Sequence, residues 1–189
     1  MQKEVLYETE KINAILGLSI IAALLCHAGT MTYSLLTSWY NLTLCKFFAH
    51  AAVGIMILHV LTSICIFFFL HDGSDARYSR QNIRTIMQRV TAILMIVFVH
   101  FHTSAYAHMA TGQTLSQGQA ICNCITECIY ILSVFVHTAV SFSKAFVTLG
   151  WINSSKAAKR LDRIAYAVCG VAALAALFAV IRFFIGDIL

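Results

Sequence analysis

The chain has 189 residues, of which 60% are hydrophobic and only 11% charged, and its mean hydropathy is +0.80. Soluble domains carry about 25% charged residues, so the composition excludes a soluble globular domain. The net charge of +5 comes from lysines and arginines between apolar segments, so it does not indicate nucleic-acid binding. The absence of proline favours long, uninterrupted helices.

Five apolar segments are long enough to cross a bilayer at about 1.5 Å per residue. They are predicted at residues 12–36, 47–70, 83–107, 120–149 and 164–185. The connections are short and contain no low-complexity linker, so the sequence predicts one all-α integral membrane domain over residues 1–189. Residues 1–13 are charged and polar for too long to open a cleavable signal peptide.

Basic residues are concentrated on one side of the predicted membrane. The loop 107–119 has no Lys or Arg, and the first loop on that side holds only Lys46. The opposite side carries Lys3, Lys11, Arg77, Arg80, Arg84, Arg89, Lys156, Lys159, Arg160 and Arg163. The positive-inside rule therefore predicts that the N-terminus is cytoplasmic and the C-terminus outside. The expected location of this multi-pass protein is a bacterial or archaeal cytoplasmic membrane.

Four spans carry a histidine at interior depth, namely His27, His59, His102 and His137. Ionisable side chains inside a membrane are costly and usually functional. At about 1.5 Å per residue, His59 and His137 lie roughly 20 Å from the cytoplasmic boundary, and the other two roughly 25 Å. This predicts an inner pair, His59 with His137, and an outer pair, His27 with His102. Two bis-histidine pairs in a helix bundle are suited to hold two haems b.

The other histidines and the cysteines fit plainer interpretations. His50, His71 and His108 are predicted near span ends, and His100 points about 200° away from His102 around its helix, so none is expected to bind haem. The segment 122–128 (CNCITEC) has neither zinc-site nor haem-attachment spacing. The seven cysteines are predicted to be apolar filler, with a disulfide near the outer surface as the open alternative.

The third span carries QRVTA at 88–92, followed by LMIVFVHFH at 94–102. It resembles the ligand-bearing helix of the cytochrome b558 membrane anchors of succinate dehydrogenases and fumarate reductases, in their single-chain, five-helix, dihaem form. The matching positions are Gln88, Arg89, Thr91, Ala92 and Phe101–His102, with Ala92 in place of the family's usual glycine. The spacing back to His59 and the stretch HTAVSFSKAFVTLGW from His137 are also similar, and the match ending at His27 is looser.

The resemblance implies the membrane-anchor subunit of a succinate:quinone oxidoreductase, complex II of the tricarboxylic acid cycle. Such a subunit anchors an iron–sulfur protein and a flavoprotein on the cytoplasmic face. It binds two haems b and passes electrons to or from a membrane quinone, expected here to be menaquinone. The enzyme's dicarboxylate chemistry then belongs to the flavoprotein, in keeping with the absence of a Gly-rich nucleotide fingerprint in this chain.

Three further residues have predicted roles near these sites. Arg89 is expected either to contact a haem propionate or the quinone site, as the resemblance implies, or to be an interfacial anchor. Thr91 is expected to add a hydrogen bond there. Glu127 is the only acidic residue within a predicted span. Its two candidate roles are proton exchange with an outer quinone and simple exposure at the outer interface, and the second is favoured.

Two other functions stay open. One is a dihaem cytochrome b of another quinone-linked complex, such as a hydrogenase, a formate dehydrogenase or a transmembrane ascorbate-type reductase. The other is a small non-haem transporter or metal-handling membrane protein that uses its histidines directly. Only the first would contain haem, so a reduced-minus-oxidised spectrum separates the two classes.

Overall fold

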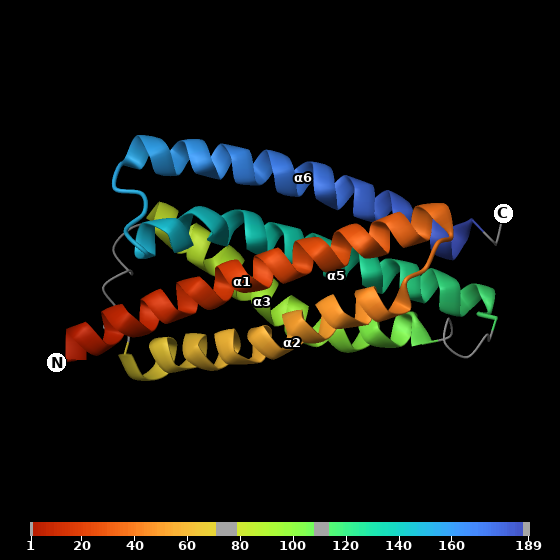
Figure 1. Cartoon of the computed structure of the whole chain (residues 1–189), viewed down its shortest axis with the longest axis horizontal. Helices are drawn as coiled ribbons and strands as arrows, with labels where there is room; N and C mark the ends of the chain where they lie inside the picture. The colour runs from red at the N-terminus through yellow and green to blue at the C-terminus, as the bar shows by residue number, and fades with distance from the viewer. Residues whose placement is uncertain (1, 71–78, 108–113, 187–189) are drawn as a thin grey trace.

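The structure is a computed structural model that describes residues 2–70, 79–107 and 114–186 (Figure 1). Its regular elements in these ranges are all helical: α1 (Gln2–Thr37), α2 (Leu42–Cys65) continued by a π-helical turn η1 (Ile66–Leu70), α3 (Ser79–Ala105), α5 (Gln117–Thr148) and α6 (Ser155–Ile185). Five helices are long and apolar enough to cross a membrane. The prediction of an all-α bundle of five such helices is therefore confirmed.

The helices begin earlier than the apolar segments that predicted them. α1 starts at Gln2 rather than residue 12, and α6 starts at Ser155 rather than residue 164. Both extensions are polar but rich in good helix formers such as Glu, Lys and Ala, and they lack proline and glycine, so the backbone stays helical beyond the apolar part. Hydropathy predicts the part of a helix that is long enough to cross a membrane, whereas helix propensity and capping residues determine where the helix itself begins and ends.

Local signals account for several of the helix ends. The Asn41 side chain accepts a hydrogen bond from the Leu44 N–H at the start of α2, and Ser116 and Gln119 form a capping box at the start of α5. α5 ends where Gly150 adopts a φ of 73° and the Trp151 N–H bonds to the carbonyl of Phe146. This is a Schellman ending, which favours glycine at the left-handed position.

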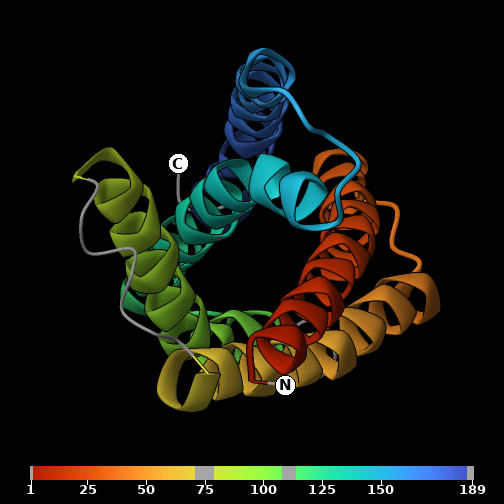
Figure 2. The same cartoon turned by 90° about the vertical axis from the view of Figure 1, so that its left-hand side faces the viewer.

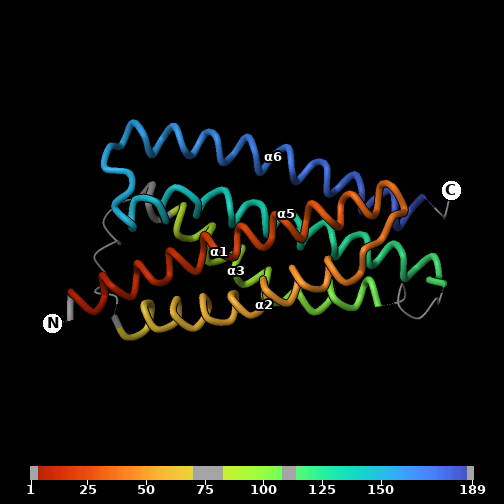
Figure 3. The backbone as a smooth tube through the Cα atoms, in the orientation of Figure 1, coloured from red at the N-terminus to blue at the C-terminus, as the bar shows by residue number. Residues whose placement is uncertain are grey.

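The helices run alternately up and down the bundle, so that α1 begins at one end and α6 finishes at the other (Figure 3). Viewed along the bundle, α1, α2, α3 and α5 surround its axis, and α6 lies outside them against α5 and α1 (Figure 2). Two antiparallel pairs pack closely, α1 with α2 and α3 with α5.

The two pairs are held apart where they face each other. Among the described residues, no Cα atom of α1 lies within 8 Å of one in α3, and none of α2 lies within 8 Å of one in α3 or α5. Directly packed helices have axes about 8–10 Å apart, so some Cα atoms of one helix would lie within about 8 Å of Cα atoms of the other. The pairs meet where α1 packs on α5, while the remaining faces are bridged only by side chains.

Small residues pack the fifth helix onto the bundle. Ala173, Ala176 and Cys169 on α6 are buried against Phe135 and Ala139 on α5. Small side chains let helix backbones approach closely, which is the main source of helix association in a membrane. α6 therefore closes one side of the bundle without contributing a histidine.

Candidate paired-histidine site

The outer histidines come from helices that do not pack directly against each other. His27 on α1 and His102 on α3 have ring centroids 6.0 Å apart, with ring planes at 83°. A metal–imidazole nitrogen bond is about 2 Å long, so two imidazoles on opposite sides of one metal have centroids about 6 Å apart. The observed separation suits two axial ligands of a single iron.

The inner histidines lie on the other two helices, His59 on α2 and His137 on α5. The backbones of these two helices stay more than 8 Å apart from Cα to Cα. His59 lies close to Gly17 of α1, where a Cβ atom would stand 3.4 Å from the Cε1 atom of the histidine. The structure therefore brings the rings of His27 and His102 together, whereas the pairing of His59 with His137 stays a prediction.

Every one of the four rings has its Nδ1 atom held by the neighbouring helix of its own antiparallel pair. The acceptors are Cys45 O for His27 at 3.3 Å, Asn13 O for His59 at 3.2 Å, Gln88 O for His137 at 3.1 Å and Glu127 Oε2 for His102 at 2.9 Å. A carbonyl oxygen can only accept, so Nδ1 carries the hydrogen in the first three. This leaves Nε2 with its lone pair free, the tautomer that binds a metal.

Thr91 lies at the inner pair, where it was expected to add a hydrogen bond. Its side chain is 5% exposed and donates to Met87 O at 2.6 Å, and its Oγ1 stands 3.1 Å from His137 Nδ1. The hydroxyl therefore supplies a second acceptor for the His137 N–H, beside the carbonyl of Gln88. Thr91 acts on the histidine from the far side of the ring, away from Nε2.

Arg89 is exposed, and its guanidinium lies over the ring of Phe67 in η1 at 4.5 Å. Such a cation–π contact contributes roughly 0.5–1 kcal/mol at an exposed site. Arg89 of α3 therefore lies on the surface of the bundle, beside the η1 turn that follows α2. Contact with a propionate or a quinone stays a prediction for this side chain.

A cavity of about 90 Å³ adjoins the outer pair. The rest of its wall is mainly aliphatic side chains of α1, α5 and α6. Its polar side chains are His27, Thr32, His102, Tyr106, Glu127, Tyr130 and Thr138. An apolar enclosure with few polar groups is the usual lining of a cofactor site.

The favoured expectation for Glu127, exposure at the outer interface, is wrong. The side chain is only 1% exposed, and its Oε2 lies 2.9 Å from His102 Nδ1. The face of α5 on which Glu127 lies explains the error. Residues on the face of α5 that packs against α3 are covered by α3, and hydropathy near the end of a span does not show which face of the helix a residue occupies. Glu127 is a functional candidate that the sequence alone did not place.

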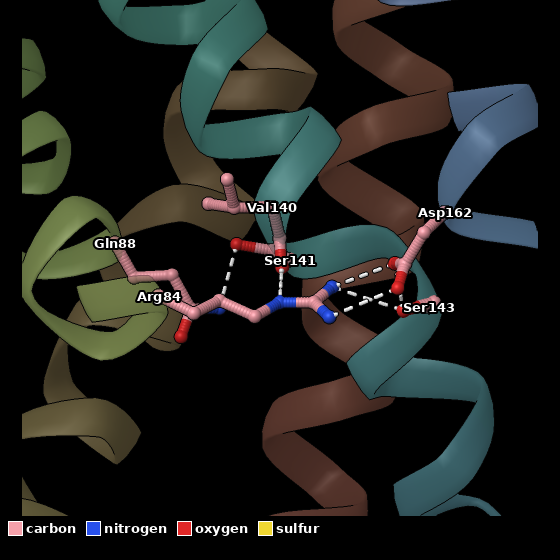
Figure 4. A network of polar contacts seen from close by, with 6 residues as sticks. All are labelled: Arg84, Gln88, Val140, Ser141, Ser143 and Asp162. Carbon is pink, nitrogen blue, oxygen red and sulfur yellow. Dashed lines mark hydrogen bonds and ion pairs between the residues drawn. The ribbon is translucent and has the colours of Figure 1, made fainter. Parts of the chain in front are cut away.

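A half-buried polar network joins α3, α5 and α6 (Figure 4). Arg84 bonds Asp162 through both terminal nitrogens, at 2.9 and 3.2 Å, and donates through Nε to Val140 O at 2.6 Å. Ser143 donates to Asp162 and accepts from Arg84. Arg84 counted as a loop cation in the predicted topology, but its charge is neutralised here by a carboxylate 78 residues further along the chain.

Among the described residues, the other histidines and the cysteine thiols make no hydrogen bond with the four interior imidazoles, although the backbone carbonyl of Cys45 bonds His27. His50 and His100 are exposed on α2 and α3, and His71 and His108 lie outside the described residues. All seven cysteines are free thiols, so the open alternative of a disulfide is not observed. Within the described ranges, no group of three or more His, Cys, Asp or Glu residues is arranged to hold a metal ion directly.

The donor set would suit haem b better than a bare metal ion, because the outer pair brings two imidazoles together at 6.0 Å and, among the described residues, no third His, Cys, Asp or Glu completes a metal site with them. The chain thus has the features of a multi-pass helical membrane protein with paired histidines. No protein-family model, curated protein or solved structure matches it.

Proposed function

We propose that this chain is a dihaem cytochrome b that carries electrons through the membrane. The observation that supports it best is the arrangement of the four interior histidines: each has Nδ1 bonded within its own helix pair, and His27 meets His102 across a gap between helix pairs. Hydrogen-bonded core histidines would need no such gap, because directly packed helices would bury them more cheaply.

The chain's own residues would act as holders and insulators. Haem b supplies one-electron redox chemistry when bound. His27 and His102 would hold one group, and His59 and His137 the other, with Thr91 orienting His137. The aliphatic walls exclude water and keep the local dielectric low, which is the protein's main means of tuning the potential besides ligand identity.

We propose further that the chain is the membrane anchor of a succinate:quinone oxidoreductase, with menaquinone as its expected quinone. The QRVTA-to-FH register of α3, which resembles that family, carries this step. The iron–sulfur and flavoprotein subunits would then cover the cytoplasmic end, where α1 begins and the basic connections lie. The N-terminus would be cytoplasmic and the C-terminus outside, in a bacterial or archaeal cytoplasmic membrane.

The test is a reduced-minus-oxidised spectrum of the protein purified from its native membranes, with haem counted per chain. Two haems b per chain, reduced by succinate and co-purifying with an iron–sulfur and a flavin subunit, are expected. Haem without succinate reduction would assign the chain to another quinone-linked cytochrome. A haem-free protein with bound transition metal would favour the transporter alternative and reject the proposal.

A further inference from the structure

The environment of His102 differs from that of the other three interior histidines. Their Nδ1 atoms face backbone carbonyls, which are neutral, whereas the Nδ1 of His102 faces a carboxylate oxygen of Glu127 at 2.9 Å. The glutamate is 1% exposed and lies about three turns before His137 on α5. The outer pair is therefore the one with a charged partner.

Aromatic side chains hold the His102 ring in the orientation that makes this contact. Tyr130 stacks on the ring, with centroids 4.7 Å apart and planes at 27°, and Tyr106 packs edge-on at 5.6 Å. Glu127 and Tyr130 are on α5 and Tyr106 follows α3, so two elements fix the ring. A ring clamped in this way keeps Nδ1 toward the carboxylate and turns Nε2 away from it.

The carboxylate is under-compensated by the protein alone. Glu127 Oε1 has no hydrogen-bond partner among the described residues, although the Tyr106 ring packs on the same His102 ring. Within the part of the chain that the structure describes, no lysine or arginine lines the adjoining cavity. A buried carboxylate without a full set of partners is costly, so a positive charge nearby would stabilise it. Oxidised haem b, with a net charge of +1 on iron and ring, would supply that charge.

We propose that Glu127 is a positioning residue that holds His102 and lowers the midpoint potential of the outer haem. A carboxylate that accepts the Nδ1–H makes the imidazole a stronger donor, and its negative charge stabilises the oxidised form of the iron through a low-dielectric medium. The inference rests on the proposed function, because it requires a haem between His27 and His102. It goes beyond that function because it names Glu127 as the side chain whose charge lowers the potential of the outer haem and not of the inner one.

The experiment is a potentiometric titration of both haems in the intact complex, comparing wild type with Glu127→Gln and Glu127→Asp. The glutamine variant keeps a carbonyl acceptor of the same length but removes the charge. We expect it to retain both haems and to favour reduction of the outer haem by at least tenfold, a rise of about 59 mV for a one-electron couple. The inner haem should keep its potential, and the aspartate variant should stay near wild type.

A matched control is Ser133→Ala, which removes another buried side chain of α5 that bonds only the carbonyl of Ile129. It should change neither potential. If Glu127→Gln does not retain the outer haem, the aspartate variant decides: retention at the wild-type potential supports the proposal, and loss or a raised potential overturns it. An unchanged outer potential in Glu127→Gln, or a shift confined to the inner haem, also overturns it. A wild-type protein without haem instead rejects the proposed function.

Discussion

At the scale of single residues, the important feature is that each interior histidine is hydrogen-bonded through Nδ1 to the other helix of its own antiparallel pair. His27 bonds to α2 and His59 to α1, while His102 bonds to α5 and His137 to α3. Hydrogen bonds of this type fix the ring tautomer and raise the basicity of the other nitrogen. The tautomer and orientation of each histidine would thus be fixed within its own helix pair before a cofactor binds between the two pairs.

The two haems should be lost separately when single histidines are replaced. We expect His59→Ala or His137→Ala to remove the inner haem and His27→Ala or His102→Ala to remove the outer one, because each iron needs both imidazoles of its pair. A redox titration with haem counted per chain measures this. His50→Ala and His100→Ala, at exposed positions, are the matched controls and should retain both. Loss of the same component from the His59 and His102 variants would contradict the pairing.

Replacing Thr91 with valine should weaken the inner site without removing a ligand. Valine keeps the shape but removes the Oγ1 atom that stands 3.1 Å from His137 Nδ1, and loss of a partner that orients a metal ligand typically costs about 10–100-fold in affinity. Haem retention during detergent washing, followed by the inner-haem spectrum, measures the effect. Thr103→Val, an exposed hydroxyl on the same helix that bonds His100 O, should have no effect.

At the scale of helices, α5 organises the bundle, because it packs against α3, α1 and α6. It carries His137 and Glu127, and its carbonyl of Val140 accepts from Arg84. That carbonyl lies about one turn beyond His137, so the Arg84–Asp162 pair joins α3 and α6 to α5 close to the inner site. In a membrane interior, where apolar burial adds little between helices, such polar contacts and close packing of small residues decide the helix arrangement.

Breaking that ion pair should destabilise the fold more than breaking a surface pair. The side chains of Arg84 and Asp162 are 30% and 19% exposed, so we expect Asp162→Asn to cost about 2–3 kcal/mol, somewhat less than the ~3–5 typical of a fully buried pair. Thermal unfolding in detergent gives the measurement. Lys11→Gln, which breaks the solvent-screened pair with Glu8, should lower stability much less, because salt and water weaken an ion pair at the surface. Equal costs in the two variants would show that the Arg84 network is not structural.

At the scale of the whole molecule, an odd number of spanning helices would put the start of α1 and the end of α6 in different compartments. α1 begins at one end of the bundle and α6 finishes at the other. The first turns of α6, which carry Lys156, Lys159, Arg160 and Arg163, lie at the end where α1 begins, so the positive-inside rule predicts that this end is cytoplasmic. In that orientation the inner histidines would be nearer a cytoplasmic partner and would receive electrons first.

Cysteine labelling in intact cells tests the orientation. In a cysteine-free background, Lys159→Cys in the first turns of α6 should react only after the cells are opened, whereas Gly118→Cys in the first turn of α5 should react from outside. Both positions are exposed, so access differs only through the membrane. Reaction of Lys159→Cys with an impermeant reagent in intact cells would invert the topology and place the proposed partners on the wrong face.

The amino-acid sequence alone determined the number and approximate position of the helices and which histidines lie deep in them. Those properties follow from local quantities: apolar length against bilayer thickness and the rise of about 1.5 Å per residue. The depth argument also placed His27 and His102 at a similar height, and the structure has these two rings 6.0 Å apart, because straight helices convert residue number into height almost linearly. The helix starts were missed since polar helix formers continue a helix without adding hydropathy.

Only the tertiary structure decided which polar groups meet around the bundle axis. Height along a helix does not define its rotation. The rotation of α5 against α3 brings Glu127 to His102, and the placement of α6 beside them brings Asp162 to Arg84. The gap between the helix pairs likewise depends on how all five helices pack. Rotation and spacing arise from side-chain packing between segments far apart in the chain, so no local pattern in the sequence carries them.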